Sequence, residues 1–179
     1  MSELILVRHG QASFGAESYD KLSPLGIEQV QLLAQHWQGN DEQFDHVYSG
    51  DLLRQRETAA ILQPLMVDPA QTPNIHLGLN EYDGTPIIDL YLRDHHQSDT
   101  PVQLPILDRK QFQLIFEAAT SRWIEGSLQP GFEDIDFEPW LDFKARVHNT
   151  MDELMARHGN GSRVLVSTSG GVIALALQR

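Results

Sequence analysis

Short apolar runs alternate with amphipathic repeats along this chain of 179 residues. The apolar runs at residues 4–7, 44–49 and 163–167 are typical of buried strands. Apolar positions recur at helical spacing in other segments, which predicts helices over residues 24–38, 52–62, 112–123, 143–155 and 172–177. Strands that alternate with helices predict an α/β fold, with a mostly parallel sheet and helices on both faces.

Capping residues and prolines refine this pattern. Ser23 followed by Pro24 predicts the start of the first helix, and Ser49 is the candidate cap of the second. Residues 74–108 show little sustained periodicity and are interrupted by prolines, so they are predicted to be loop with short elements. The simplest organisation is one domain over residues 1–179 with a loop-rich insertion at about 74–108.

Composition narrows the classes of partner. The formal net charge of −12 disfavours nucleic acid and anionic membranes, which both bind basic surfaces. A small anionic substrate is still allowed if cationic side chains gather in one pocket. The chain has no cysteine, which excludes disulfides and thiolate chemistry. With no targeting or membrane-spanning segment in the sequence, we expect a soluble, cytoplasmic protein, and its oligomeric state is left open.

Side chains suited to phosphate chemistry follow three of the predicted strands. Arg8-His9-Gly10 comes directly after the first strand, Ser49 and Arg54 follow the second, and Ser169-Gly170-Gly171 follows the last. Ligands of open α/β folds bind at the carboxyl edge of the sheet, so these groups are expected to converge there. Imidazole can attack phosphorus, guanidinium pairs with phosphate oxygens, and glycine lets a ligand approach the backbone.

Four segments in this order resemble the histidine phosphatase superfamily, the phosphoglycerate-mutase-like enzymes, over nearly the whole chain. Arg8-His9-Gly10 is similar to the signature of the family, and residues 22–29 are similar to its Leu-Thr-x-x-Gly-x-x-Gln segment. Residues 49–59 resemble its Ser-x-x-x-x-Arg-x-x-x-Thr-Ala helix, and residues 79–81 match its Leu-x-Glu. The ordered set is far more specific than any single segment.

The resemblance implies a phosphatase that hydrolyses phosphomonoesters of small molecules, with no metal and no cofactor. His9 would be the nucleophile that forms a phosphohistidine, and Glu81 would be the general acid and then the general base. Asp83 is the alternative acid. The phosphoryl oxygens would be bound by Arg8, Arg54, Ser169 and Gly170.

The chain departs from the family at Ser169, where relatives usually carry a second histidine. Loss of one preorganised transition-state donor typically costs about a hundred- to a thousandfold in rate. The alternative function is therefore a weak or inactive phosphate-binding or regulatory protein. A phosphoglycerate mutase is less favoured, because Gly15 stands where mutase-like members often have asparagine. The histidines that could replace the missing ring are His76, His95, His96 and His148, and none is favoured.

Two further expectations concern metals and chain length. The histidines and acids show no convincing ligand spacing, so a metal-dependent hydrolase is not favoured. Relatives generally continue beyond the last strand, whereas this sequence stops at Arg179. A minimal domain or a truncated chain is therefore expected.

Overall fold

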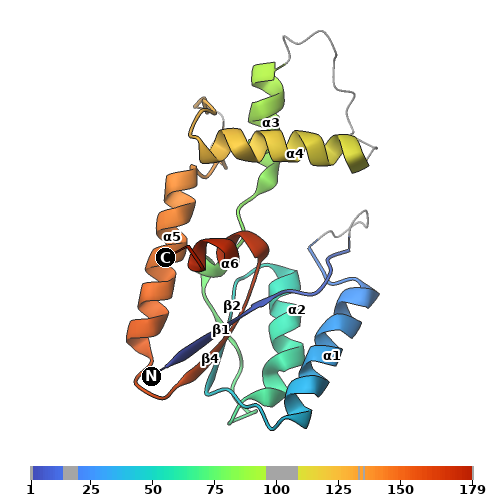
Figure 1. Ribbon diagram of the computed structural model, residues 1–179, viewed down its shortest axis with the longest axis vertical. Helices are drawn as coiled ribbons and strands as arrows, with labels where there is room; N and C mark the ends of the chain where they lie inside the picture. Colours follow the sequence, from blue (N-terminus) through green and yellow to red (C-terminus); the bar gives the residue numbers. More distant parts are fainter. Residues whose placement is uncertain (1, 14–19, 96–108, 133, 135, 179) are drawn as a thin grey trace. The chain divides into compact units, whose positions relative to one another are not determined.

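The computed structural model describes residues 2–13, 20–95, 109–132, 134 and 136–178 (Figure 1). The chain separates into two compact units, one made of residues 1–81 and 146–179 and the other of residues 82–145. The expectation of one domain over residues 1–179 stays a prediction, to which the structure adds this subdivision.

Within the described residues, the first unit is built on a parallel sheet of four strands. Their order is β1 (Glu3–Arg8), β4 (Arg163–Thr168), β2 (His46–Ser49) and β3 (Asn74–Ile75). Each neighbouring pair is parallel. The central strand β4 is fully buried from residue 164 to residue 168, as expected for a strand covered on both faces. The predicted mostly parallel α/β fold is confirmed.

The register of the strands brings their carboxyl ends to one edge of the sheet. Arg8 of β1 pairs with Thr168 of β4, and Ser49 of β2 pairs with Ser167 of β4. The backbone N–H of His9 extends the ladder by donating to the Thr168 carbonyl at 2.9 Å. The segments that follow β1, β2 and β4 therefore begin side by side.

Helices cover both faces of this sheet, as predicted. Figure 1 shows α1 (Pro24–Gly39) and α2 (Leu53–Leu62) on one side and α6 (Gly170–Ala176) on the other. The core lies between the first pair of helices and the sheet, where Val30 and Leu62 belong to the same buried cluster as residues of β1, β2 and β4. This apolar face holds the helices against the strands and so places the helix that carries Arg54.

The cap of α1 was predicted correctly, and the cap of α2 was predicted wrongly. The Ser23 side chain accepts from the Gly26 N–H at 3.0 Å, and Pro24 occupies the first turn of α1. Ser49, however, ends β2 and its hydroxyl donates to the Gly50 carbonyl, so it does not cap α2. That helix begins four residues later, where the Asp20 carboxylate accepts from the Leu53 N–H at 2.8 Å.

The second unit contains α3 (Gly84–His95), α4 (Arg109–Ile124) and the first residues of α5 (Trp140–Arg157). The loop prediction for residues 74–108 is wrong over α3. Pro86 lies in the first turn of α3, where a helix needs no N–H from it, and Ile87 and Leu90 are buried. The short strand β3 and a 3₁₀ turn (Leu77–Leu79) fit the expectation of short elements.

The remaining helices of the second unit pack through aromatic side chains. Trp123 of α4 lies against Tyr82 with the rings tilted by 41° and lies edge-on to Trp140. Its N–H donates to the Glu138 carbonyl at 2.7 Å. Helix α4 ends before Gly126, which adopts a φ of 68°, as the sequence predicts. No helix among the described residues is long and apolar enough to cross a membrane.

Candidate active site

His9 follows β1 with its two ring nitrogens in different surroundings. Nδ1 lies 2.7 Å from the Gly10 carbonyl oxygen, which only accepts hydrogen bonds, so Nδ1 carries the ring hydrogen. Nε2 lies 3.1 Å from Arg54 Nε, which only donates, so Nε2 presents its lone pair. These contacts select a neutral imidazole whose Nε2 atom is the available nucleophile.

The surroundings of His9 also favour the neutral ring over the charged one. Burial lowers the pKa of His9 below its usual value of 6.5, and the charges of Arg54 and Arg8 lower it further. The hydrogen bond to the Gly10 carbonyl acts in the opposite direction but does not reverse the shift.

We expect the pKa of His9 to lie below 6.5 in the folded protein and to return to its usual value on unfolding. Protonation of the ring then costs more in the native state, so His9 contributes fully to stability above pH 6.5. That contribution is lost as the pH falls through the lower native pKa. Titration of the His9 ring by NMR, assigned with His9→Ala, measures the shift. A native pKa above 6.5 would contradict the geometry.

Gly10 packs closely against the start of α1. A Cβ atom at Gly10 would lie 2.3 Å from the Gly26 carbonyl oxygen, and one at Gly26 would lie 2.1 Å from the Gln11 carbonyl oxygen. The two glycines therefore let the segment that follows β1 approach the first turn of α1 closely. That a ligand approaches the backbone at Gly10 stays a prediction, and the packing against α1 is a separate reason for glycine at this position.

Arg54 reaches His9 from the first turn of α2 and is held there by Asp20. Its Nη1 group forms an ion pair with the Asp20 carboxylate, and its backbone N–H donates to the Asp20 carbonyl at 2.6 Å. The Arg54 side chain is only 13% exposed, so this contact fixes the direction of the guanidinium. Sequence reasoning missed Asp20, and a polar residue shortly before Ser23 carries no signal that would have selected it.

Asp20→Asn is expected to lower the rate of phosphoryl transfer about ten- to a hundredfold, because Arg54 loses the charge that orients it. Substrate affinity should change less, since removal of a negative charge beside an anion site favours binding. Steady-state kinetics separate the two effects. Asp20→Ala should also lose the cap at Leu53 and about 0.5–2 kcal/mol of stability. Equal activity in wild type and Asp20→Asn would show that Arg54 needs no such partner.

Arg8 and Gly170 lie beside each other at the edge formed by β1 and β4. Arg8 is exposed, and a Cβ atom at Gly170 would lie 3.7 Å from Arg8 Nε and 3.8 Å from Cζ. The guanidinium thus extends along the turn that follows β4. The structure therefore brings together two of the residues predicted to bind phosphate.

Glu81 lies at the same turn. Its carboxylate accepts from the Gly171 N–H at 2.9 Å. The preceding loop is held from two sides, since the Leu79 carbonyl accepts from Thr168 Oγ1 at 2.6 Å and the Asn80 carbonyl accepts from Arg146 Nη1 at 2.9 Å. The predicted acid is thereby fixed beside the residues that follow β4.

Ser169 is almost fully buried, and its hydroxyl accepts from Gln55 Nε2 at 2.8 Å. Sequence reasoning missed Gln55, although a signal was present. Gln55 shares one buried stripe of α2 with Thr58, Ala59 and Leu62. A polar amide on such a stripe indicates an internal hydrogen bond.

The other candidates have different positions. His76 donates through Nε2 toward Glu153 at 3.2 Å, and the Asp83 carboxylate accepts from the Thr85 N–H at the start of α3 in the second unit. Arg56 of α2 is exposed beside Asp51. Gly15, His96 and the side chain of His95 lie outside the described residues.

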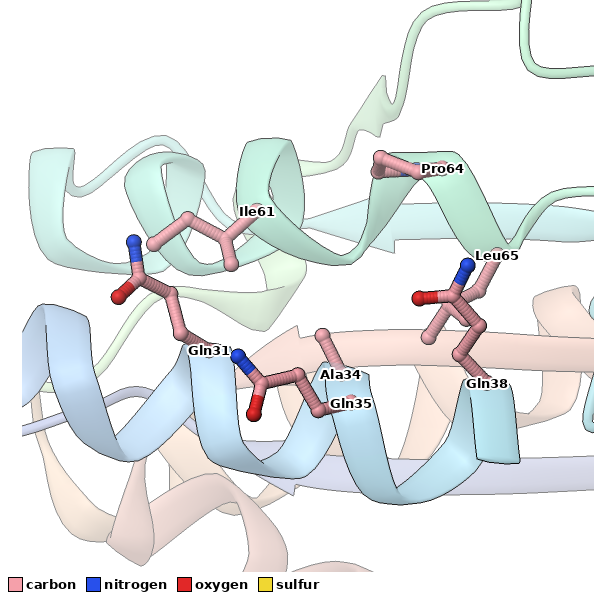
Figure 2. A pocket seen from close by; sticks show the side chains of 7 residues that line it. All are labelled: Gln31, Ala34, Gln35, Gln38, Ile61, Pro64 and Leu65. Carbon is pink, nitrogen blue, oxygen red and sulfur yellow. The ribbon is translucent and has the colours of Figure 1, made fainter. Parts of the chain in front are cut away.

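A groove on the surface of the first unit offers no comparable chemistry. Figure 2 shows it between α1 and the end of α2, lined by Gln31, Ala34, Gln35, Gln38, Ile61, Pro64 and Leu65. None of these side chains is charged or titratable, so the groove has no acid, base or cation for a phosphate. Within the described parts of the chain, no three histidine, aspartate or glutamate side chains gather as metal ligands.

Comparison with known proteins identifies the family. The sequence model of the histidine phosphatase superfamily (branch 1) matches residues 4–100. The chain belongs to this superfamily. It is 26% identical to phosphoglycerate mutase-like protein 4 of Arabidopsis thaliana over 99% of this chain and 70% of that protein.

Solved structures show the same fold. The alpha-ribazole phosphatase of Shigella flexneri matches with a TM-score of 0.64 and 21% identity over 98% of this chain and 78% of that chain. Phosphoglycerate mutase of Bacillus anthracis matches with a TM-score of 0.62 and 20% identity over 98% of this chain and 78% of that chain. Phosphatases and a mutase therefore share this architecture.

Proposed function

We propose that the protein is a metal-independent phosphatase that hydrolyses phosphomonoesters of small molecules through a phosphohistidine at His9. The observation that carries the proposal is the neutral imidazole of His9, whose Nε2 lone pair faces the Arg54 guanidinium. A nucleophile beside a fixed cation suits attack on a phosphoryl group, because the cation offsets charge on the equatorial oxygens.

In the first step, Nε2 of His9 would attack phosphorus while the bond from phosphorus to the ester oxygen breaks. Arg54, still paired with Asp20, would donate from Nε to a phosphoryl oxygen in place of His9 Nε2, and Arg8 would bind a second oxygen from the turn at Gly170. Glu81 would protonate the leaving oxygen. The two guanidinium groups supply the positive charge for which other phosphatases use metal ions.

In the second step, water would attack phosphorus and the bond from phosphorus to Nε2 would break. Glu81 would take the proton of the water and so recover the proton that it gave to the leaving group. The products are inorganic phosphate and the alcohol. The formal net charge of −12 disfavours large polyanionic substrates, so the substrate is proposed to be small. The compartment is proposed to be the cytoplasm.

A phosphate-binding or regulatory role is the second candidate, and Ser169 favours it. An uncharged, buried hydroxyl stabilises a transition state less than a protonated imidazole would. Such a protein would bind phosphate at Arg8, His9 and Arg54 but turn over slowly. A mutase ranks below both.

Hydrolysis of p-nitrophenyl phosphate, with a rapid acid-free quench during turnover, separates these functions. A phosphatase is expected to release phosphate with chelator present and to accumulate a phosphoryl group that is lost in acid and stable in base, as an N–P bond requires. Phosphate binding without any turnover would support the regulatory role. Transfer of the phosphoryl group to a phosphoglycerate, in place of water, would support the mutase.

A further inference from the structure

We propose that Gln55 is a positioning residue of this site, which turns the Ser169 hydroxyl so that it donates a hydrogen bond to the bound phosphoryl group. The proposal rests on the proposed function, since it assigns how the same anion is held. Ser169 and Gln55 then act as a pair, in which Ser169 touches the ligand and Gln55 acts through Ser169.

The contacts of Gln55 fix the orientation of its amide. Nε2 donates to the Leu79 carbonyl at 3.1 Å and to Ser169 Oγ at 2.8 Å. A carbonyl oxygen can only accept, so the nitrogen and not the oxygen must face Leu79. Both amide hydrogens are then used. If the amide were rotated to present Oε1 to Ser169, Nε2 would lose its hydrogen bond to the Leu79 carbonyl.

The opposite side of the amide is fixed by packing. Gln55 is fully buried, and a Cβ atom at Gly50 would lie 1.9 Å from Gln55 Oε1. Gly50 therefore makes room for the amide oxygen at the end of β2. A buried oxygen without a hydrogen-bond partner, as Oε1 is among the described residues, costs stability. Such a cost is tolerated where the same group serves a site.

The hydroxyl of Ser169 consequently has a defined direction. Its oxygen accepts from Gln55, and this is its one hydrogen bond within the described part of the chain. The hydroxyl hydrogen must point away from Nε2 of Gln55. Ser169 lies between Thr168, whose carbonyl binds the His9 N–H, and Gly170, which lies against Arg8. An anion held by His9 and Arg8 would therefore meet a hydroxyl that is already oriented as a donor.

A double-mutant cycle tests this pair. Gln55→Met keeps the length of the side chain and removes its donors, and Ser169→Ala removes the hydroxyl. We expect either change to weaken orthovanadate binding, measured by calorimetry, and to lower kcat/KM for p-nitrophenyl phosphate by about tenfold or more. In the Ser169→Ala background, Gln55→Met should then cost less than about threefold, because the residue it acts through is gone.

Gln55→Glu provides a measurement, the pH dependence of vanadate affinity, that would not change if Gln55 acted only through packing. A carboxylate can only accept, so the Ser169 hydroxyl would turn toward residue 55 and away from the anion. Protonation of the introduced carboxylate restores a donor, and the difference in vanadate affinity from wild type should narrow as the pH falls. Gln35→Glu, on the exposed side of α1, is the control for the added charge and should bind vanadate as wild type does. Melting temperatures identify variants that fail to fold. If either Gln55→Met or Gln55→Glu does not fold, the other is combined with Ser169→Ala in the cycle.

Three results would overturn the proposal. If Gln55→Met costs as much with alanine at 169 as with serine, Gln55 acts through Leu79 or through packing. If Gln55→Glu shows the same pH dependence of vanadate affinity as wild type, Gln55 does not orient the hydroxyl. If wild type binds no vanadate, the site itself is wrong. Failure of the proposed function is a separate result, because a protein that binds vanadate but forms no phosphohistidine still yields the binding cycle.

Discussion

His9→Ala is expected to abolish phosphatase turnover, with a loss of at least about four orders of magnitude, as for removal of other catalytic nucleophiles. The imidazole would supply the atom that bonds to phosphorus, and this atom, Nε2, is the ring nitrogen that faces Arg54. Without His9, water would have to attack phosphorus directly, with no phosphohistidine intermediate.

The folded state should survive this change. β1 pairs with β4 over all six of its residues, and the bond from the backbone of residue 9 to the Thr168 carbonyl does not depend on the side chain. Circular dichroism and the melting temperature check the fold, and His36→Ala on the exposed face of α1 is the matched control. A folded His9→Ala protein that keeps most of its activity would rule out covalent catalysis at this residue.

Glu81→Gln is expected to lower kcat/KM by about a hundred- to ten-thousandfold for an alkyl phosphomonoester such as glycerol phosphate. The alkoxide of such a substrate is a poor leaving group and needs the proton that Glu81 would give. p-Nitrophenolate leaves without protonation, so the same variant should lose much less kcat/KM with p-nitrophenyl phosphate. Glutamine can still accept from the Gly171 N–H, which keeps the loop in place.

The comparison of the two substrates distinguishes acid catalysis from a general disturbance of the site. A disturbed site would lower both values of kcat/KM by similar factors, and that outcome would contradict the role of Glu81. Asp83→Asn is the control for the alternative acid and should leave kcat/KM unchanged for both substrates. Asp83 accepts from the Thr85 N–H at the start of α3, and the asparagine amide oxygen can accept the same bond, so stability should change little.

Local sequence patterns predicted most of the elements of the first unit. The apolar runs identified β1, β2 and β4 because strands buried on both faces need continuous apolar residues. Ser23 and Pro24 identified the start of α1 because capping is a local interaction. The cap of α2 was predicted wrongly, since its first N–H groups are bound by Asp20, a residue from a distant part of the chain.

The site shows the same division. Arg8, His9, Arg54 and Ser169 were selected from the sequence because they follow predicted strands, and Glu81 because residues 79–81 match the Leu-x-Glu of the family. The resemblance to the family shows only that a histidine is usual at the position of Ser169. The fully buried Gln55 amide, 2.8 Å from Ser169 Oγ, shows that the space beside Ser169 is already filled, so a larger ring there would have to displace it.

The sequence by itself determined the class of fold, the strand ends that meet at one edge, and the residue types that can perform phosphoryl chemistry. These depend on periodicity and on the order of motifs, which are properties of the chain. Only the tertiary structure decided which nitrogen of His9 is available, that Asp20 directs Arg54, and that Gly10 serves the contact with α1. Those features depend on hydrogen bonds and close approaches between segments far apart in the sequence, for which local patterns carry no signal.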